Sequence, residues 1–205
     1  MDDLPQETRR PVDFKLEPIP IPLADIKKLE LYPHATGGYG DIWKCSMSNT
    51  KFGTRCVAVK SIRVSQSDDK ELYKIGRRIR REAYVWINLS HDNILSFEGI
   101  INDFGQLPAL VSLWMENGSL NVYLKNVFPS LSSRRKLELI QQVAAGLSYL
   151  HGEDVVHGDL TATNIFVDDH GNLRLADFGL SMIAAESGNL TFGSLQSANT
   201  RWMAP

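Results

Sequence analysis

Three side chains towards the C-terminal end of the sequence could act together on a phosphoryl group. Asp159, Asn164 and Asp177 lie within residues 155–181, VVHGDLTATNIFVDDHGNLRLADFGLS. Carboxylate and amide oxygens are ligands for magnesium, and a carboxylate can also accept the proton of an attacking hydroxyl. The residue types and their spacing suit magnesium-assisted transfer of a phosphoryl group. Because a lone aspartate is usually a turn or cap residue, the preceding elements must be weighed with them.

A glycine-rich turn and a strand that ends in lysine precede this segment. Residues 35–43, ATGGYGDIW, predict a tight turn that opens into an alternating strand. Glycine lets backbone N–H groups approach phosphates with no Cβ in the way. An ordinary hairpin would show the same glycines. The strand Val57-Ala58-Val59-Lys60 that follows makes a phosphate site the more specific interpretation.

Two amphipathic helices and a strand between them should position these groups. Residues 74–89 carry apolar side chains at three- and four-residue steps, with Glu82 beside the apolar stripe. Residues 107–124 predict a strand that breaks at 116–118 and enters a helix capped by Ser119. A long helix from about residue 132 to residue 151 then leads to the aspartates. Its predicted core face comprises Leu137, Ile140, Ala144, Leu147 and Leu150.

Together these segments resemble the catalytic core of a eukaryotic protein kinase, over roughly residues 29–205. The strings LVSLWMENGSL and RWMAP are most similar to the tyrosine-kinase-like group of serine/threonine kinases. The resemblance implies an α+β, two-lobed fold. It has a small antiparallel β lobe with one regulatory helix and an incomplete, mainly helical large lobe.

The resemblance also implies a role for each catalytic residue. Asp159 matches the catalytic base, and Lys60 the lysine that holds the α- and β-phosphates of ATP. Glu82 matches the glutamate that pairs with this lysine, while Asn164 and Asp177 match the ligands of Mg²⁺. His157 corresponds to a packing and hydrogen-bonding residue, and we assign it no general-base role despite its suitable intrinsic pKa.

The nucleotide contacts implied by the resemblance are distributed over both lobes. Ser112 matches the gatekeeper position, and residues 113–115 offer backbone groups to adenine. The full set of implied contacts is Gly37, Gly38, Gly40, Ile42, Ala58, Lys60, Ser112, Leu113, Met115 and Phe166.

Four positions depart from the family pattern. Ala35 replaces the first glycine of the loop, which should restrict its flexibility. Gly158 replaces the arginine that reads a phosphorylated activation loop, and Thr161 replaces a lysine near the transferring phosphate. Asn199 aligns with a threonine that contacts the catalytic loop. We therefore expect slower chemistry and less control by loop phosphorylation.

The domain boundary is expected near Leu29. Residues 1–28 are rich in proline and should form an extended or disordered extension, and residues 29–205 form the kinase domain. Within it we expect a small lobe at about 29–114, a hinge at about 113–118 and a partial large lobe at 119–205. The chain stops at Pro205, before the remaining large-lobe helices of the family. We expect this to leave apolar surface open to a partner protein or to self-association.

Composition narrows the class of protein. The net charge of −2 argues against nucleic acid as an obligate partner. Two cysteines are too few for a disulfide framework, which favours a reducing cytoplasmic or nuclear setting. The sequence has neither a run of about 18 apolar residues nor a signal-peptide pattern at its start. We therefore expect an intracellular protein without a membrane span.

The expected function is ATP-dependent phosphorylation of serine or threonine hydroxyls in protein substrates, with ATP and Mg²⁺ as cofactors. Two alternatives stay open. The chain could be a pseudokinase that binds nucleotide and acts as an interaction module. It could also be a small-molecule phosphotransferase, because such enzymes share the His-Gly-Asp and asparagine pattern.

Overall fold

The computed structural model describes residues 16–37, 40–49, 53–64 and 69–177. These residues form two short 3-10 helices, three α-helices and eight strands. In chain order they are η1 (Leu23–Asp25), β1 (Ile26–Lys28), β2 (Ala35–Gly37), β3 (Gly40–Asn49), β4 (Gly53–Ile62), α1 (Asp69–Ile87), β5 (Phe97–Ile101), β6 (Ala109–Leu113), α2 (Leu120–Val127), η2 (Phe128–Ser130), α3 (Ser133–Gly152), β7 (Ile165–Val167) and β8 (Leu173–Leu175).

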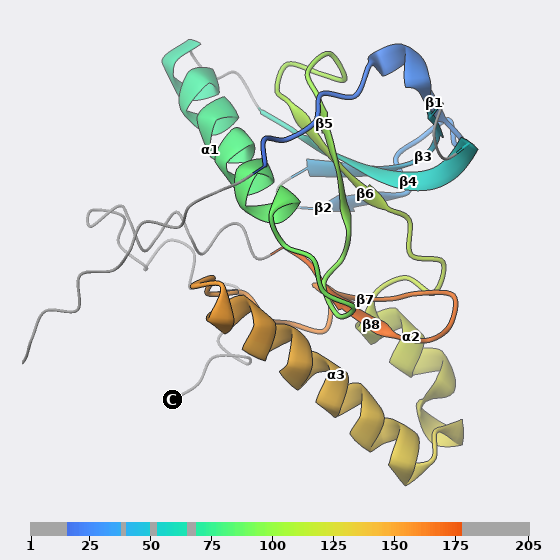
Figure 1. The fold of residues 1–205 in the computed structure, drawn as a ribbon. Coiled ribbons are helices and arrows are strands. Elements are labelled where there is room, and N and C mark those ends of the chain that lie inside the picture. The colour runs from blue at the N-terminus through green and yellow to red at the C-terminus, as the bar shows by residue number, and fades with distance from the viewer. Residues whose placement is uncertain (1–15, 38–39, 50–52, 65–68, 178–205) are drawn as a thin grey trace, which may run out of the picture.

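The elements form two lobes (Figure 1). The first lobe is an antiparallel sheet in the order β1-β3-β4-β6-β5, with β2 paired to β3, and α1 packs against it. The second lobe contains α2, α3 and the two-stranded sheet β7-β8. This arrangement confirms the expected α+β, two-lobed fold. None of the described helices is long and apolar enough to cross a membrane.

The alternation of side chains along β4 gives the main sheet two different faces. Val57 and Val59 are fully buried on one face, in a cluster with Cys45 and Val111. Because successive side chains of a strand point to opposite faces, Ala58 and Lys60 lie on the other face. This second face packs against the larger apolar cluster, which includes residues of α1 and of the second lobe.

Helix α1 begins earlier than the sequence predicts, at Asp69, and ends at Ile87. Its predicted apolar stripe is largely buried, with Ile79, Ala83 and Trp86 at most 4% exposed. The Trp86 indole N–H donates to the carbonyl of Leu95 over 2.6 Å, and its ring stacks on Phe97. These contacts fix the C-terminal half of α1 to the chain that leads into β5.

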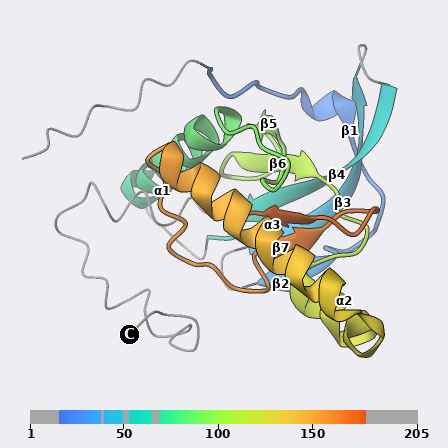
Figure 2. The same ribbon diagram turned by 60° about the horizontal axis from the view of Figure 1, so that its bottom comes forward.

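The second lobe is built around α3, which packs against β8 (Figure 2). Its N-cap, Ser132, accepts a hydrogen bond from the N–H of Arg135. The predicted core face of this helix is only partly correct. Leu150 is fully buried, but Leu137 and Ile140 are 56% and 66% exposed, since no described element covers that side of the helix. Leu139 and Gly146 are buried instead.

The described part of the N-terminal extension differs from the expectation. Residues 16–22 are mostly extended, but η1 and β1 follow, and β1 pairs with β3 in the register Ile26 to Met47. The sheet therefore begins before residue 29. Residues 1–15 lie outside the described residues, and the proposed division into extension and domain stays a prediction.

Candidate functional site

Strand register places several predicted nucleotide contacts on one face of the main sheet. Ile42 of β3 pairs with Lys60 of β4, and Ala58 of β4 pairs with Ser112 of β6. Paired residues of antiparallel strands carry their side chains on the same face. Ser112 is 8% exposed, and Ile42, Ala58 and Lys60 are half-buried. These four residues, with Lys60 among them, therefore lie next to one another on one face of the main sheet.

Lys60 makes a direct ion pair with Asp177. Its Nζ lies 2.5 Å from Oδ1 of the aspartate, and the side chains are 23% and 31% exposed. Burial lowers the pKa of Lys60, but the charges of Asp177 and Glu82, together with the hydrogen bond to Asp177, raise it above its ordinary value. Lys60 is therefore a cation at neutral pH, and it joins the first lobe to the segment that follows β8.

Glu82 of α1 lies in the same charged cluster but without a direct contact to Lys60. Within the described residues, no hydrogen bond or ion pair is formed between Glu82 and Lys60. Burial raises the pKa of Glu82 above its ordinary value. The positive charge of Lys60 opposes this rise and the negative charge of Asp177 adds to it, so the net shift is upward. The two carboxylates thus share one cation, which lies nearer to Asp177. The predicted pairing of Glu82 with Lys60 stays a prediction.

Asp159 is oriented by Asn164 within one loop. The Asn164 Nδ2 group donates to the backbone carbonyl of Asp159 and to its Oδ2, both over 2.9 Å. The loop is closed by a third bond of 3.0 Å, from the N–H of Asn164 to the carbonyl of Thr161. Since both amide hydrogens of Asn164 are used, its Oδ1 is left as an oxygen ligand.

Backbone hydrogen bonds place Asp177 beside this loop. The N–H of Ala176 donates to the carbonyl of Asn164 over 2.9 Å, and the N–H of Leu175 donates to that of Asn93 over 2.8 Å. Asp177 itself has a φ of 57°, a left-handed conformation that costs free energy in most residues but that aspartate tolerates. The Asp177 carboxylate and the oxygen of Asn164 thus come from neighbouring segments, and a carboxylate with an amide oxygen is a donor set that fits Mg²⁺ bound with phosphate oxygens.

At the predicted hinge between the lobes, one backbone donor has no partner among the residues that the structure describes. The N–H of Leu113 donates to the carbonyl of Ser96, and the N–H of Trp114 donates to that of Cys56. The N–H of Met115 donates to no group of the described residues, while its carbonyl accepts from Gly118 over 3.0 Å. A free donor beside the buried Ser112 suits the edge of a planar heterocycle such as adenine.

The positions that depart from the family pattern have structural consequences. Gly158 has a φ of 70°, which favours glycine, so an arginine there would be strained. Thr161 is 5% exposed, and its hydroxyl lies 2.6 Å from that of Thr163. His157 is 2% exposed, and burial lowers its pKa, opposed by Asp159 and Asp177. A buried neutral imidazole agrees with the packing role expected of His157.

The remaining predicted site residues are only partly described. Phe166 of β7 is half-buried and forms a bridge with Ser119, where α2 begins. Gly37 pairs with Gly40 across the β2-β3 connection. Gly38, the Phe178-Gly179 pair and Asn199 lie outside the described residues. Sequence reasoning missed the contact between Lys60 and Asp177, because no local pattern shows whether Glu82 or Asp177 lies nearer to Lys60.

Comparisons with known proteins cover nearly the whole chain. The family model described as protein tyrosine and serine/threonine kinase matches residues 33–205. The serine/threonine-protein kinase STY46 of Arabidopsis thaliana is 30% identical over 92% of this chain and 32% of its own length. STY17 of the same plant is 28% identical over 88% of this chain and 30% of its length. The discoidin domain-containing receptor tyrosine kinase B of Caenorhabditis elegans is 35% identical over 71% of this chain and 17% of its length. The chain spans about a third or less of each of these relatives.

Proposed function

Because the chain belongs to the protein tyrosine and serine/threonine kinase family, we propose that it transfers the γ-phosphoryl group of ATP to serine or threonine hydroxyls of protein substrates. A protein kinase domain implies binding of ATP and a protein substrate. The preference for serine and threonine is supported by relatives such as STY17 and STY46, which are serine/threonine kinases by name.

The observation that carries this proposal is the convergence of Lys60, Asp159, Asn164 and Asp177 from three separate segments. Lys60 supplies a fixed positive charge for the phosphates of ATP, at the end of the sheet face that would receive adenine. Asp159 is held by the amide of Asn164, so its carboxylate is oriented to accept the proton of the attacking hydroxyl.

Asp177 and Asn164 are the residues that would hold Mg²⁺ in the proposed site. One oxygen of the Asp177 carboxylate forms the ion pair with Lys60. The hydrogen bonds that the Asn164 side chain makes to Asp159 use its Nδ2 group and not its oxygen. When bound, the ion would neutralise charge that develops on the phosphate oxygens. Without it, the carboxylate of Asp177 keeps Lys60 where the phosphates would be received.

An intracellular location is also proposed. Cys45 and Cys56 are both free, and Cys45 is fully buried on β3. Burial raises the pKa of the Cys45 thiol to about 11, so this group stays protonated and unreactive. Free thiols of this kind are common in the reducing interior of the cell.

The proposal is tested first by nucleotide binding. Thermal unfolding of residues 1–205 is recorded with and without magnesium-ATP at about 100 times the dissociation constant, where binding should add roughly 2.7 kcal/mol to the free energy of unfolding. Asp177→Asn should abolish the magnesium-dependent part of this shift. The matched control is Asp169→Asn, which removes an exposed carboxylate from the turn between β7 and β8.

Transfer is then measured with radiolabelled ATP and a generic protein substrate. Incorporation into serine or threonine supports the proposal. A magnesium-dependent shift without any transfer would favour the pseudokinase alternative, and transfer to a small hydroxylated molecule alone would favour the small-molecule phosphotransferase. A cooperative transition that magnesium-ATP leaves unchanged would overturn the nucleotide site itself.

A further inference from the structure

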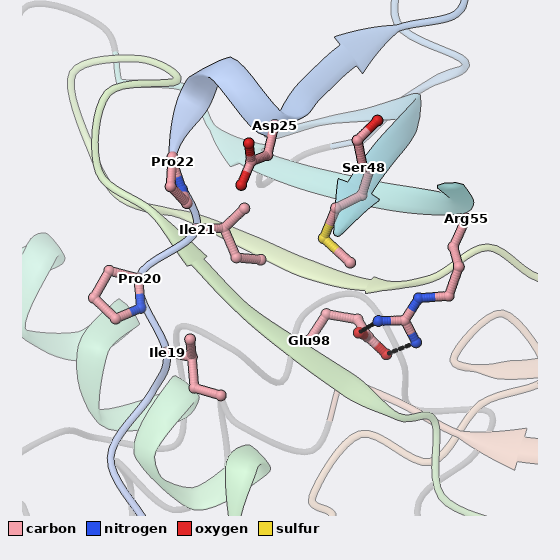
Figure 3. Close-up of a pocket in the computed structure, with 9 residues that line it drawn as sticks. Ile19, Pro20, Ile21, Pro22, Asp25, Ser48, Arg55 and Glu98 are labelled. Atoms are coloured by element: carbon pink, nitrogen blue, oxygen red, sulfur yellow. Dashed lines mark hydrogen bonds and ion pairs between the residues drawn. The ribbon is translucent and has the colours of Figure 1, made fainter. Parts of the chain in front are cut away.

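The N-terminal segment 16–22, called the strap below, lies along the free edge of β5 (Figure 3). The N–H of Ile100 donates to the carbonyl of Ile19 over 3.0 Å, and the N–H of Ile21 donates back to Ile100 over 2.7 Å. Pro20 forms the bridge between them, and in this parallel geometry the missing N–H of proline points away from β5. The strap thus closes an otherwise open sheet edge.

Gly99 makes the approach of the strap possible. Its φ is 148°, and an added Cβ would lie 2.3 Å from the carbonyl oxygen of Ile19 and 3.1 Å from the side chain of Ile21. A bulge in the pairing of β5 with β6 occurs at the same place. No other residue type fits there while the strap is docked.

The other end of the strap is attached to α1. The N–H of Leu16 donates to Oδ1 of Asn88, and Nδ2 of Asn88 donates to the carbonyl of Leu16, both over 3.0 Å. A hydrogen bond with Glu17, together with the charge of that carboxylate, also raises the pKa of the Tyr84 hydroxyl. The strap therefore connects the C-terminal end of α1 to the edge of β5.

These attachments lie away from the face of α1 that carries Glu82. At 3.6 residues per turn, Tyr84 lies about 200° further round the helix than Glu82. Asn88 is the first residue after α1. The opposite side of α1 packs on the sheet through Ile79 and Ala83. The helix is thus held between the sheet on one side and the strap on the other, with Glu82 directed at Lys60 and Asp177.

The strap is docked more by its backbone than by solid packing. Residues 19–22 line a cavity of about 180 Å³ together with residues of β3, β4 and β5, among them the bidentate ion pair Arg55–Glu98 (Figure 3). This volume is below the range of about 300–1,000 Å³ that is usual for small-molecule sites. Ile21 packs against the apolar cluster of the main sheet, whereas Leu16 and Ile19 are more than half exposed, so the strap is held by its backbone hydrogen bonds and by one apolar side chain.

We propose that Asn88 is a positioning residue that acts through the strap: by holding Leu16, it keeps α1 where Glu82 faces Lys60 and Asp177. The predicted effect of Asn88 on magnesium-ATP affinity rests on the proposed kinase function. The predicted effect of Asn88 on the stability of α1 does not, and the two effects are measured in separate experiments.

Hydrogen exchange of the full chain tests the effect on α1. Asn88→Ala removes the strap bonds, but it also removes the bond from Asn88 to the carbonyl of Tyr84 that caps the helix. Gly99→Ala and Leu16→Pro disturb the strap without touching that cap. All three variants should exchange α1 amides at least about fivefold faster, as expected for the loss of one or more net hydrogen bonds. The controls Asn121→Ala, on α2, and Gly105→Ala, whose added Cβ meets nothing within 4 Å, should leave α1 unchanged.

The proposal is overturned if only Asn88→Ala speeds exchange in α1, since its role would then be limited to capping. Leu16→Pro alters an exposed residue, so it keeps the test decisive even where Gly99→Ala does not fold.

A double-mutant cycle tests whether the strap acts through Glu82. Magnesium-ATP affinity is measured for Asn88→Ala, Glu82→Gln and the double variant. If Asn88 positions Glu82, the affinity lost on Asn88→Ala should be about fivefold in the native background and absent in the Glu82→Gln background. Equal losses in both backgrounds would overturn this mechanism. A native chain that binds no magnesium-ATP would instead count against the proposed function, and the exchange experiment would still decide the role of the strap.

Discussion

Lys60 and Asp177 meet across 117 residues of sequence, whereas Asp159 and Asn164 meet across five. The first contact joins two charges from different lobes, and the second joins a carboxylate to an amide within one loop. The long-range contact depends on the sheet, on α1 and on the placement of β8. The local contact depends mainly on the conformation of its own loop. The difference indicates that the proposed proton acceptor, Asp159, is oriented by its own loop, while the residues proposed to bind phosphate and metal are brought together by the tertiary fold.

The largest expected effect separates these two halves of the site. Asp159→Asn removes the proposed proton acceptor and should lower the rate of transfer by roughly 10²–10⁴-fold. Magnesium-ATP affinity should change little, because Lys60 and Asp177 are untouched. The rate is measured at saturating ATP, with Asp169→Asn as control. A similar loss of ATP affinity would show that the two halves are not separate.

The second prediction breaks the contact between the lobes. Lys60→Met removes the charged partner of Asp177 and a group that would bind phosphate. Hydrogen bonds to charged groups contribute about 1.5–3 kcal/mol, so the dissociation constant of magnesium-ATP should rise roughly 10- to 100-fold. Isothermal calorimetry measures this constant, and Lys125→Met on the exposed surface of α2 is the matched control. Unchanged binding would mean that the ion pair has no role in nucleotide recognition.

The third prediction tests the packing that places Asp177. Gly146 allows α3 to approach β8, because an added Cβ would lie 2.7 Å from Leu175 and 2.9 Å from the carbonyl of Asn93. Gly146→Ala should therefore lower the free energy of unfolding by about 1–3 kcal/mol, measured with urea. Gly152→Ala is the control near the end of the same helix, since its added Cβ meets nothing within 4 Å. Equal stability of the two variants would show that this approach is not tight.

The smallest expected effect concerns pH. Burial lowers the pKa of His157 from its ordinary value of 6.5, so the unfolded chain takes up this proton before the folded chain does. Stability should fall as the pH drops below about 6.5, until the folded state also binds the proton. Each unit of the pKa difference is worth about 1.4 kcal/mol. His157→Gln should flatten this part of the stability profile recorded between pH 7.5 and 5. A profile that the substitution does not change would rule out the buried histidine as its cause.

The sequence predicted more of the local structure than of the tertiary contacts. The apolar stripe of α1 is confirmed at Ile79, Ala83 and Trp86, since helical periodicity shows which residues share a face. The same reasoning was wrong for Leu137 and Ile140 of α3, because periodicity identifies an apolar face but not what covers it. The strap was also missed. Its prolines indicate an extended chain, but they do not show that Gly99 leaves room for it on β5.

By itself the sequence determined the order of the motifs, the family and the two-lobed α+β fold, because turn glycines, strand alternation and helical periodicity act over a few residues at a time. Only the tertiary structure decided that Lys60 contacts Asp177 more closely than Glu82, and that residues 16–22 connect α1 to β5. These choices depend on distances of a few ångströms between segments that are far apart in the chain. Such distances are set by strand register and by how closely helices pack, and no local pattern records them.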